Sequence, residues 1–424
     1  MSQLLRFWIW HQLARIKSWF FPTFFRHYFQ QVKIKHLLAF IHKQVPFYQK
    51  QGVRQFHQLP IIDKVIMQEN FEKMNSANIT YQEATHLQLS TNKSANYSLG
   101  TSGPNGIYLF SEAERQQELA SILSKLHPVT GLCPVKVAVF YLSKTPYLHT
   151  VNSACFKWQF YDLQANTQIW LDQLNQNSPD IIVAPVQTLC LLAHYQNNNS
   201  IMLKPKKIVA TQEVLTPVEE NLISTAFKQN VFQLYQCAEG FLGSTCEMGT
   251  LHLNEDQYYI EKEWIDEKKD KFIPVITSLH RRLQPLVRYR MNDILKISPT
   301  PCSCGSAHLA IEKIIGRCED MLYFQKYGNS TTLKTIYSDE FLLAINRARG
   351  GVEKFQLIQH SPMHIEIKLK AKNMKIAKQG VFEQLEKLFH QYNVKSPQLN
   401  FSSLDTLSLS HLFRQTQRLA KMPM

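Results

Sequence analysis

The hydrophobic pattern changes its period several times between residues 135 and 235. Short runs of β-branched and aromatic residues, typical of buried strands, cover residues 135–142, 180–186, 207–211 and 231–235. Apolar residues at helical spacing separate several of these runs, at residues 187–195 and 217–228. Strands that alternate with helices pair in parallel through helical crossovers, so the pattern predicts an α/β domain with mostly parallel sheets.

Three of the predicted strands are followed by loops of polar or small residues. These loops are Ser143-Lys144-Thr145, Gln212-Glu213 and Cys237-Ala238-Glu239-Gly240. In open α/β sheets, ligands bind beyond the carboxyl ends of the strands. We therefore expect the chemistry of this chain at these loops.

The pattern further along the chain predicts antiparallel strands at residues 257–264, 272–279 and 286–297. After Arg317, it predicts a small α+β unit. Its expected elements are a helix at 338–349 with Ser338 as N-cap, a hairpin at 354–359 and 364–370, a helix at 381–392 and a strand at 398–404. We divide the chain into a basic helical segment (1–60), a large domain with an antiparallel subdomain (61–316) and a small C-terminal domain (317–424).

Residues 8–43 have the spacing of two basic amphipathic helices that are broken near Pro22. No Asp or Glu occurs before Asp63, and the whole chain carries a formal charge of +14. A solvated basic surface, contact with an anionic partner and nucleic-acid binding are three explanations. The anionic partner could be an acidic carrier protein, a polyphosphate cofactor or a peripheral membrane surface. We expect no nucleic-acid partner, because the sequence shows no nucleic-acid-binding module.

The composition is that of a globular protein, with 44% hydrophobic and 19% charged residues among 424. No apolar run reaches the length of a membrane span, about 18 residues, and the opening segment lacks the features of a signal peptide. The eight cysteines show no disulfide-scaffold spacing. We therefore expect a reducing, cytoplasmic compartment. The oligomeric state is left open.

The loop Gly100-Thr101-Ser102-Gly103-Pro104-Asn105-Gly106 is the sharpest local signal. Small residues let the backbone approach a phosphate, and the two hydroxyls add hydrogen-bond donors. The loop has no Lys, so it is not a Walker-type loop. Taken alone, Pro-Asn-Gly favours an ordinary hairpin turn.

Two acidic residues are further candidates. Glu239 follows a predicted parallel strand, where a carboxylate can hold Mg²⁺ beside a nucleotide; taken alone, it is more typical of a helix N-terminus. Asp293, in the segment 288–293, is placed near a strand end, where Asp can bind ribose hydroxyls. The arginines beside it could meet phosphate or make surface ion pairs.

A split set of Cys and His residues could hold a metal. Three thiolates and one imidazole form a closed tetrahedral site for structural zinc. The spacing differs from that of standard zinc fingers, and the other five cysteines of the chain are expected to be small buried hydrophobic residues. The residues are Cys246, His252, Cys302 and Cys304.

These signals, in this order, resemble the phenylacetate–coenzyme A ligase group of adenylate-forming enzymes. The similar segments are the phosphate loop at 100–106, the adenine-contacting loop Thr211-Gln212-Glu213, the aromatic-x-x-x-Glu motif at 235–240, the Tyr-Arg-x-x-Asp element within 288–293 and the hinge at 316–320. Residues 35–70 also resemble the entry region of that group. Some of its members hold zinc with a Cys-x5-His and a Cys-x-Cys pair, as Cys246/His252 and Cys302/Cys304 would. The resemblance covers residues 35–330 well and the tail weakly.

The resemblance implies ATP-dependent activation of an aryl or fatty carboxylic acid to an acyl-adenylate, which a thiol of coenzyme A or of a carrier protein then captures. It implies the adenylate-forming enzyme fold with a mobile small domain, and ATP, Mg²⁺ and structural Zn²⁺ as cofactors. The loop at 143–158 is a candidate wall of the acyl pocket. The implied roles are phosphate binding by Thr101, Ser102, Gly103 and Gly106, nucleotide binding by Thr211, Gln212, Glu213, Tyr235 and Gln236, Mg²⁺ binding by Glu239, ribose binding by Asp293 and hinge action by Arg317.

One departure from the family pattern concerns the C-terminal lysine. Leu412 stands where the family has this Lys, and Arg414, Arg418 or Lys421 are possible substitutes. A cation at developing charge accelerates such reactions strongly. A catalytically weakened relative that binds a nucleotide or acyl group is therefore the second hypothesis. The third is a membrane- or nucleic-acid-associated protein in which the zinc and the loops are purely structural.

Overall fold

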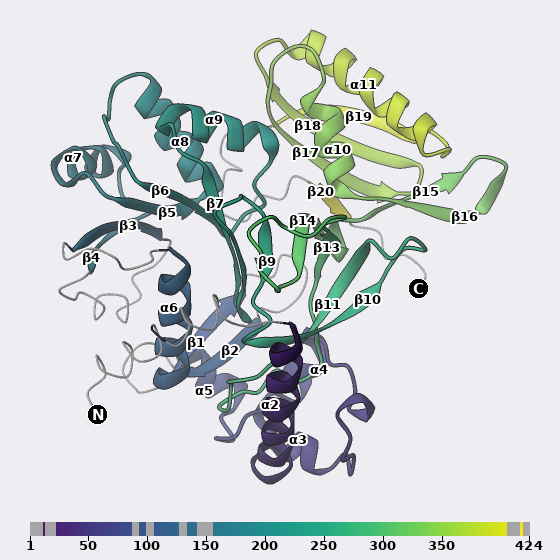
Figure 1. Cartoon of the computed structure of the whole chain (residues 1–424). Coiled ribbons are helices and arrows are strands. Elements are labelled where there is room, and N and C mark those ends of the chain that lie inside the picture. The colour runs from purple at the N-terminus through teal and green to yellow at the C-terminus, as the bar shows by residue number, and fades with distance from the viewer. Residues whose placement is uncertain are drawn as a thin grey trace. The chain divides into compact units, whose positions relative to one another are not determined.

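The computed structural model describes residue 12 and residues 23–86, 93–98, 106–126, 134–141, 156–404 and 416–418 (Figure 1). The chain forms two compact units. Unit 1 comprises Met1–Glu263, Val275–Met291 and Ile297–Lys313, and unit 2 comprises Trp264–Pro274, Asn292–Lys296 and Ile314–Met424. Among the described residues, no helix combines the length and the apolar character that crossing a bilayer requires.

A parallel sheet lies at the centre of unit 1, and its strands follow the order β7-β6-β5-β3-β4. The strands are β3 (Val135–Tyr141), β4 (Phe156–Asp162), β5 (Ile181–Pro185), β6 (Lys207–Thr211) and β7 (Val231–Cys237). The helices that cover them are α6 (Glu112–Leu126), α7 (Thr167–Asn177), α8 (Val186–Asn197) and α9 (Pro217–Phe227). The predicted α/β class and parallel pairing are confirmed.

Helices cover both faces of this sheet because its strands are apolar on both sides. On β5, Ile182 and Ala184 pack into the core that α7, α8 and α9 share. The alternate residues Ile181 and Val183 pack into a second core with Leu123 of α6. Figure 1 shows α8 and α9 on one side of the strands and α6 on the other. Each fully buried aliphatic side chain of this kind contributes about 1.5–3 kcal/mol.

The remaining strands of unit 1 are mostly antiparallel. β7 returns directly into β8 (Gly240–Thr245), which pairs with β9 (Leu251–Leu253). β1 (Lys93–Ser98) and β2 (Gly106–Ser111) form a hairpin that is paired from Lys93↔Ser111 to Ser98↔Gly106. β10 (Tyr258–Trp264), the end of β11 (Lys271–Ser278), β12 (Tyr289–Arg290) and the start of β14 (Ala310–Arg317) complete the strands.

The N-terminal part of unit 1 is helical. The long helix α2 (Thr23–Gln44) is the second of the two helices that the pattern predicts, and Gln12 is helical in the region of the first. Shorter elements follow it along the chain. They are α3 (Pro46–Gln49), η1 (Phe56–Gln58), α4 (Lys64–Glu69), η2 (Phe71–Met74) and α5 (Tyr81–His86).

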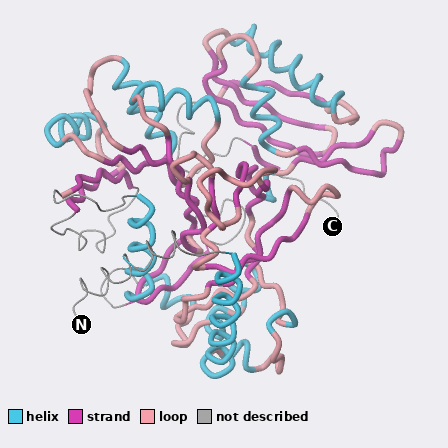
Figure 2. Tube along the Cα trace, viewed as in Figure 1, coloured by secondary structure: helices cyan, strands magenta, loops and turns pink. Residues whose placement is uncertain are grey.

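Unit 2 contains a four-stranded sheet in the order β19-β18-β17-β20. Phe324, Phe341 and Phe389 lie in its apolar core, and in Figure 2 the magenta strands run beside cyan helices. The predicted first helix, hairpin and strand are confirmed; the second helix is present, but it begins at Met374 and not at residue 381. The elements are β13 (Asp293–Ile297), η4 (Cys318–Asp320), β15 (Leu322–Lys326), β16 (Asn329–Ile336), α10 (Ser338–Asn346), β17 (Val352–Ser361), β18 (His364–Ala371), α11 (Met374–Gln391), β19 (Gln398–Ser403) and β20 (Thr416–Arg418).

Two local predictions are wrong. Ser338 is not the N-cap of α10, because Tyr337 has that place and the Ser338 hydroxyl donates to the Ile315 carbonyl at 3.3 Å. The apolar pattern at 286–297 forms two short strands, Tyr289–Arg290 and Asp293–Ile297, instead of one; the left-handed φ of 50° at Arg288 interrupts the extended backbone before the first of them. The hairpin β15–β16 was not predicted.

Candidate active site and metal centre

Glu239 lies in the turn between β7 and β8, where Cys237 and Gly240 are paired across antiparallel strands. The helix N-terminal role considered for Glu239 is therefore wrong, because the chain continues as a strand. Gly240 has a φ of 146°, and a Cβ at this position would overlap the hydroxyl of Tyr258. Only glycine fits this corner of the turn.

Two tyrosine hydroxyls meet the Glu239 carboxylate. Tyr108 of β2 donates to Oε1 of Glu239 at 2.7 Å, and Tyr289 of β12 lies 3.4 Å from the same oxygen. The two hydroxyls are 2.8 Å apart. Burial, reinforced by the negative charge of Glu239, raises the pKa of both tyrosines well above the usual value, so both remain neutral donors.

This contact joins three of the segments that carried sequence signals. Tyr108 stands two residues after Gly106, the last residue of the predicted phosphate loop. Tyr289 belongs to the Tyr-Arg-x-x-Asp element, and Glu239 to the aromatic-x-x-x-Glu motif. Since Ser98 is paired with Gly106, the loop between them begins and ends at one end of the β1–β2 hairpin.

The predicted adenine-contacting loop starts at the carboxyl end of β6. Thr211 is paired with Pro185, the last residue of β5, so the two neighbouring strands end together. Gln212 adopts a left-handed φ of 68°, and Glu213 Oε2 accepts a hydrogen bond from the backbone N–H of Gln187 at 2.9 Å. Gln212 and Glu213 are exposed beyond the strand end.

Tyr235 and Gln236 are adjacent on β7, and their exposure differs. Tyr235 is buried, whereas Gln236 is exposed. The pairing of β7 with β8 shifts register between these two residues, so the strand is irregular where the exposure changes. The motif therefore has one residue in the core and one exposed before Glu239.

The arginines of segment 288–293 make ion pairs. Arg288 forms a two-point contact with Glu261 at 2.9 and 3.0 Å, and Arg290 binds Glu263 at 2.7 and 2.8 Å. The ion-pair alternative is therefore confirmed for both. Asp293 was expected near the end of a strand, but it is the first residue of β13. It belongs to unit 2.

Arg317 is the last residue of β14, and its side chain is exposed. Gly316 before it has a φ of 147°, and a Cβ there would lie 2.5 Å from the Ser338 hydroxyl. Other predicted positions lie outside the described residues. They are Thr101, Ser102, Gly103, residues 143–155 of the acyl-pocket loop, Leu412, Arg414 and Lys421.

Sequence reasoning missed the buried charges behind the Glu239 turn. The Arg281 side chain is fully buried, and it donates to the carbonyls of Glu239 at 2.8 Å and Leu109 at 2.7 Å. Burial opposes the charged form of Glu114, but the nearby Arg281 and several backbone N–H groups outweigh it and lower the pKa of Glu114. Burial raises the pKa of Glu118. No periodic pattern distinguishes these residues from surface charges.

The predicted Cys/His set comes together in unit 1. The ligand atoms of Cys246, His252, Cys302 and Cys304 all lie within 4.8 Å of one another. The two sulfurs of Cys246 and Cys302 are 3.7 Å apart, and Cys304 Sγ is 3.4 Å from His252 Nε2. The pairing of β9 with β14 at His252↔Ala310 brings the two halves together.

Electrostatics make one thiol of this Cys/His cluster acidic. Burial would raise the pKa of Cys302, but hydrogen bonds, the largest from Thr250, lower it to about 6. Burial raises the pKa of Cys304 to about 11, and the neighbouring Cys302 and Cys246 add to this. A divalent metal ion binds such thiols by displacing their protons.

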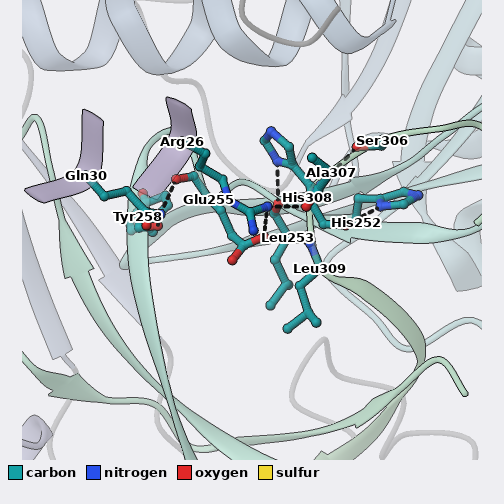
Figure 3. Close-up of polar contacts among 10 residues, drawn as sticks. All are labelled: Arg26, Gln30, His252, Leu253, Glu255, Tyr258, Ser306, Ala307, His308 and Leu309. Carbon is teal, nitrogen blue, oxygen red and sulfur yellow. Dashed lines mark hydrogen bonds and ion pairs between the residues drawn. The ribbon is translucent and has the colours of Figure 1, made fainter. Parts of the chain in front are cut away.

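A second layer of hydrogen bonds orients His252. His252 Nδ1 lies 3.0 Å from the His308 carbonyl, which leaves Nε2 directed at the thiols. On the other side of the same segment, Leu309 N donates to Glu255 at 2.6 Å, and Glu255 pairs with Arg26 of α2 at 2.7 Å. Figure 3 shows this chain of contacts, in which Arg26 also donates to the Ala307 carbonyl.

Comparisons with known proteins agree with this fold. No protein-family model matches the chain. The indoleacetate–lysine synthetase of Pseudomonas savastanoi is 28% identical over 144 residues, which cover 32% of this chain and 34% of that protein. The chain thus matches about a third of the length of this curated relative.

Solved structures match over nearly the whole chain. The structure of 2-hydroxyisobutyryl-CoA ligase in the postadenylation state has a TM-score of 0.73 at 13% identity and covers 96% of this chain and 91% of the other. An acyl acid amido synthetase in complex with 2,4-DB has a TM-score of 0.58 at 13% identity, with coverages of 92% and 91%. The chain therefore has the mixed α/β fold of adenylate-forming ligases. The narrower phenylacetate–coenzyme A ligase group stays a prediction.

Proposed function

We propose that this protein activates a small carboxylic acid with ATP. The acid's carboxylate oxygen attacks the α-phosphorus, the bond from the α-phosphorus to the bridging oxygen breaks, and pyrophosphate leaves with the electron pair. One observation carries the proposal: within unit 1, the Glu239 carboxylate contacts Tyr108, which follows the segment that resembles a phosphate loop, and Tyr289, which begins the Tyr-Arg-x-x-Asp element. The ligase structures with the same fold include one bound to R3-HIB-AMP.

The residues of the Glu239 turn fit a magnesium ion. Carboxylate oxygens are the ligands that Mg²⁺ prefers, and one or two of them commonly suffice beside phosphates. Both tyrosine hydroxyls contact Oε1, and among the described residues Oε2 of Glu239 accepts no hydrogen bond. When bound there, Mg²⁺ would neutralise charge on the phosphates. Tyr108 and Tyr289 would hold the carboxylate still, which lowers the cost of orienting it.

The roles of the remaining residues come from the resemblance alone. Thr101, Ser102 and Gly103 would face the phosphates, the exposed Gln212 and Glu213 would approach the adenine, and Asp293 would bind the ribose. Arg317 would act at a hinge before the small domain.

An ATP–pyrophosphate exchange assay tests the activity. Purified protein should exchange labelled pyrophosphate into ATP with an aromatic or medium-chain acid, and only when Mg²⁺ is present. Glu239→Gln should lower the exchange rate by about 100-fold or more. Glu220→Gln removes an exposed carboxylate of α9 and should leave the rate unchanged. A wild-type protein that exchanges with no acid of a broad panel would contradict the proposal.

The acceptor of the acyl group is the second part of the proposal. We favour the thiol of coenzyme A or of an acidic carrier protein. Residues 1–62 contain no Asp or Glu, so their positive charge would attract either of these anionic partners. An amine is the alternative, because the curated relative is named a lysine-ligating synthetase and one structural neighbour is an amido synthetase. Mass spectrometry of products formed with coenzyme A, a carrier protein and a set of amino acids distinguishes the two.

A catalytically weakened protein is the second candidate function, and the absence of Lys at position 412 favours it. In that case the protein binds ATP or an acyl-adenylate but exchanges pyrophosphate slowly. Leu412→Lys should then increase exchange, while a variant with Lys at the neighbouring His411 should not. Equal rates in both variants and the wild-type protein would argue against this candidate.

We also propose that the Cys/His cluster holds one structural zinc ion. Three sulfurs and one imidazole nitrogen are the donors of a closed tetrahedral zinc site, and the distances between them suit a shared ion. The His252–His308 hydrogen bond fixes the tautomer that leaves Nε2 for the metal. Mass spectrometry under native conditions should show one zinc per chain.

A further inference from the structure

A fully buried arginine lies directly behind the Glu239 turn. Arg281 has no exposed surface, and its guanidinium stacks on the ring of Phe110 at 4.0 Å. One of its terminal nitrogens donates to the Glu239 carbonyl at 2.8 Å, and the other to the Leu109 carbonyl at 2.7 Å. Arg281 therefore holds the backbone of two segments that lie far apart in the sequence.

These two carbonyls belong to residues at or next to the two ends of the hydrogen bond between Tyr108 and Glu239. Leu109 follows Tyr108 directly on β2, and Glu239 contributes both its carbonyl to Arg281 and its carboxylate to Tyr108. The planar guanidinium has a fixed spacing between its donors. It thus fixes how far the β7–β8 turn stands from β2, and with it the direction of the carboxylate.

The fold alone does not require a charge at this place. Burying a cation is costly, and apolar residues of similar volume often stabilise a core equally well or better. The chain instead surrounds Arg281 with buried acids: Glu114, which accepts hydrogen bonds from the backbone N–H groups of Arg282 and Leu283, and Glu118. Because burying this charged cluster is costly, its position against the turn that carries Glu239 indicates that Arg281 has a role at that turn.

We infer that Arg281 is the positioning residue for the Glu239 carboxylate: its two hydrogen bonds hold the turn against β2 in the orientation that binds the metal–nucleotide complex. The inference rests on the proposed function of the Glu239 turn and assigns a residue that acts through Glu239 without touching the substrate. Partners of this kind around a metal ligand commonly account for about 10–100-fold in metal affinity or activity.

The test compares three variants by pyrophosphate exchange over a range of Mg²⁺ concentrations. Arg281→Met should raise the Mg²⁺ concentration for half-maximal exchange by about tenfold or more, with the KM for the acid unchanged. Arg281→Lys keeps the cation but not the two-point fork, so its shift should be smaller. Arg115→Met is the matched control, because Arg115 is also buried and stacks on Phe110 at 5.1 Å, but comes from α6. Its half-maximal Mg²⁺ concentration should equal that of the wild-type protein.

The outcomes separate this inference from the proposed function. If the wild-type protein exchanges pyrophosphate, equal Mg²⁺ dependence in Arg281→Lys and the wild-type protein overturns the inference, even if Arg281→Met fails to fold. A similar shift in Arg115→Met would show a general effect of lost core charge and also overturns it. If the wild-type protein does not exchange, binding of Mn²⁺ in the presence of ATP, followed by electron paramagnetic resonance, gives the same comparison. If no Mn²⁺–ATP binds, the inference falls together with the proposed function.

Discussion

The Glu239 turn and the Cys/His cluster both lie in unit 1, but they are held together in different ways. At the turn, Oε1 of Glu239 is contacted by two tyrosine hydroxyls, and its carbonyl accepts a hydrogen bond from a guanidinium. In the cluster, Cys246 and Cys302 contact each other, and Cys304 contacts His252. Hydrogen bonds from tyrosine hydroxyls and a guanidinium hold the first site, whereas the second consists of thiols and an imidazole whose proposed common partner is a metal ion.

Removal of the metal should have the largest effect and should separate the two regions. Cys302→Ser should abolish the zinc content and lower the free energy of unfolding by about 4 kcal/mol, because losing a structural metal belongs to the most damaging single changes. Metal analysis and urea unfolding measure both quantities. Below its unfolding transition, the variant should still bind Mn²⁺–ATP, since no atom of the Glu239 turn is altered.

The matched control for this change is Cys190→Ser, which alters a half-buried cysteine of α8 outside the cluster. This variant should keep one zinc per chain. If Cys190→Ser and Cys302→Ser have the same zinc content, the cluster is not the metal site, and the distinction between a preformed and a metal-dependent region is lost.

The next largest effect concerns the link between helix α2 and the cluster. Arg26→Met breaks the 2.7 Å ion pair with Glu255 and the bond to the Ala307 carbonyl, while both charged side chains are only 14% and 16% exposed. We expect the free energy of unfolding to fall by about 2 kcal/mol and zinc to be released faster to a chelator. Hydrogen exchange should increase in α2 and around residues 306–309 together.

Lys33→Met is the comparison for Arg26→Met, because Lys33 lies on the same helix and its ammonium stands 5.3 Å from the ring of Phe29. It should leave zinc release unchanged. If Arg26→Met increases hydrogen exchange in helix α2 but zinc is released at the wild-type rate, the hydrogen bonds through Glu255 and His308 do not couple the helix to the metal.

A smaller effect is expected from the hydroxyls at Glu239. Tyr289→Phe removes the longer of the two contacts and should lower the exchange rate by about tenfold, roughly 1.4 kcal/mol. Tyr108→Phe removes the 2.7 Å bond and should lower it further. The KM for the acid should stay constant in both. A larger effect for Tyr289→Phe than for Tyr108→Phe would mean that the shorter hydrogen bond is not the one that orients Glu239.

The sequence was informative where a few residue types have a local meaning. β6 occupies the predicted residues 207–211, because its β-branched run is bounded by polar residues on both sides. The Cys/His cluster was predicted since its ligand types are rare and lie in two short segments. Ser338 was misplaced as an N-cap because a hydroxyl in the first turn can bond a distant carbonyl instead, here that of Ile315.

The partners of Glu239 could not be predicted in the same way. Tyr108 lies in the hydrophobic run 107–110, which forms part of the buried strand β2 and gives no sign of a polar partner. Arg281 lies in the polar run 280–282, where an exposed loop is the ordinary interpretation, yet its side chain is buried. Both depend on pairings over distances of 131 and 42 residues, which no local pattern contains.

The smallest predicted effect concerns acid, which should weaken the two regions through different groups. Burial, with the nearby Arg281 and Arg282, lowers the pKa of His280 to about 4, although Glu114 opposes this. The unfolded chain takes up a proton at this residue near the usual pKa of about 6.5, while the folded chain does not until about pH 4. The contribution of His280 is therefore fully present above pH 6.5 and is lost as the pH falls towards 4. Because the imidazole is only half-buried, we expect a loss of about 1 kcal/mol between pH 7.5 and 5.

His280→Asn should remove this part of the pH dependence, so that its unfolding free energy, measured in urea at pH 7.5, 6 and 5, declines less than that of the wild-type protein. Zinc release should occur at the same pH in both, since it depends on protonation of the Cys/His ligands. The acid sensitivity of the core behind Glu239 would then be independent of the metal. If His280→Asn shifts the pH of zinc release and the pH dependence of unfolding together, the two regions unfold as one cooperative unit. Their different interactions would then not lead to separate unfolding.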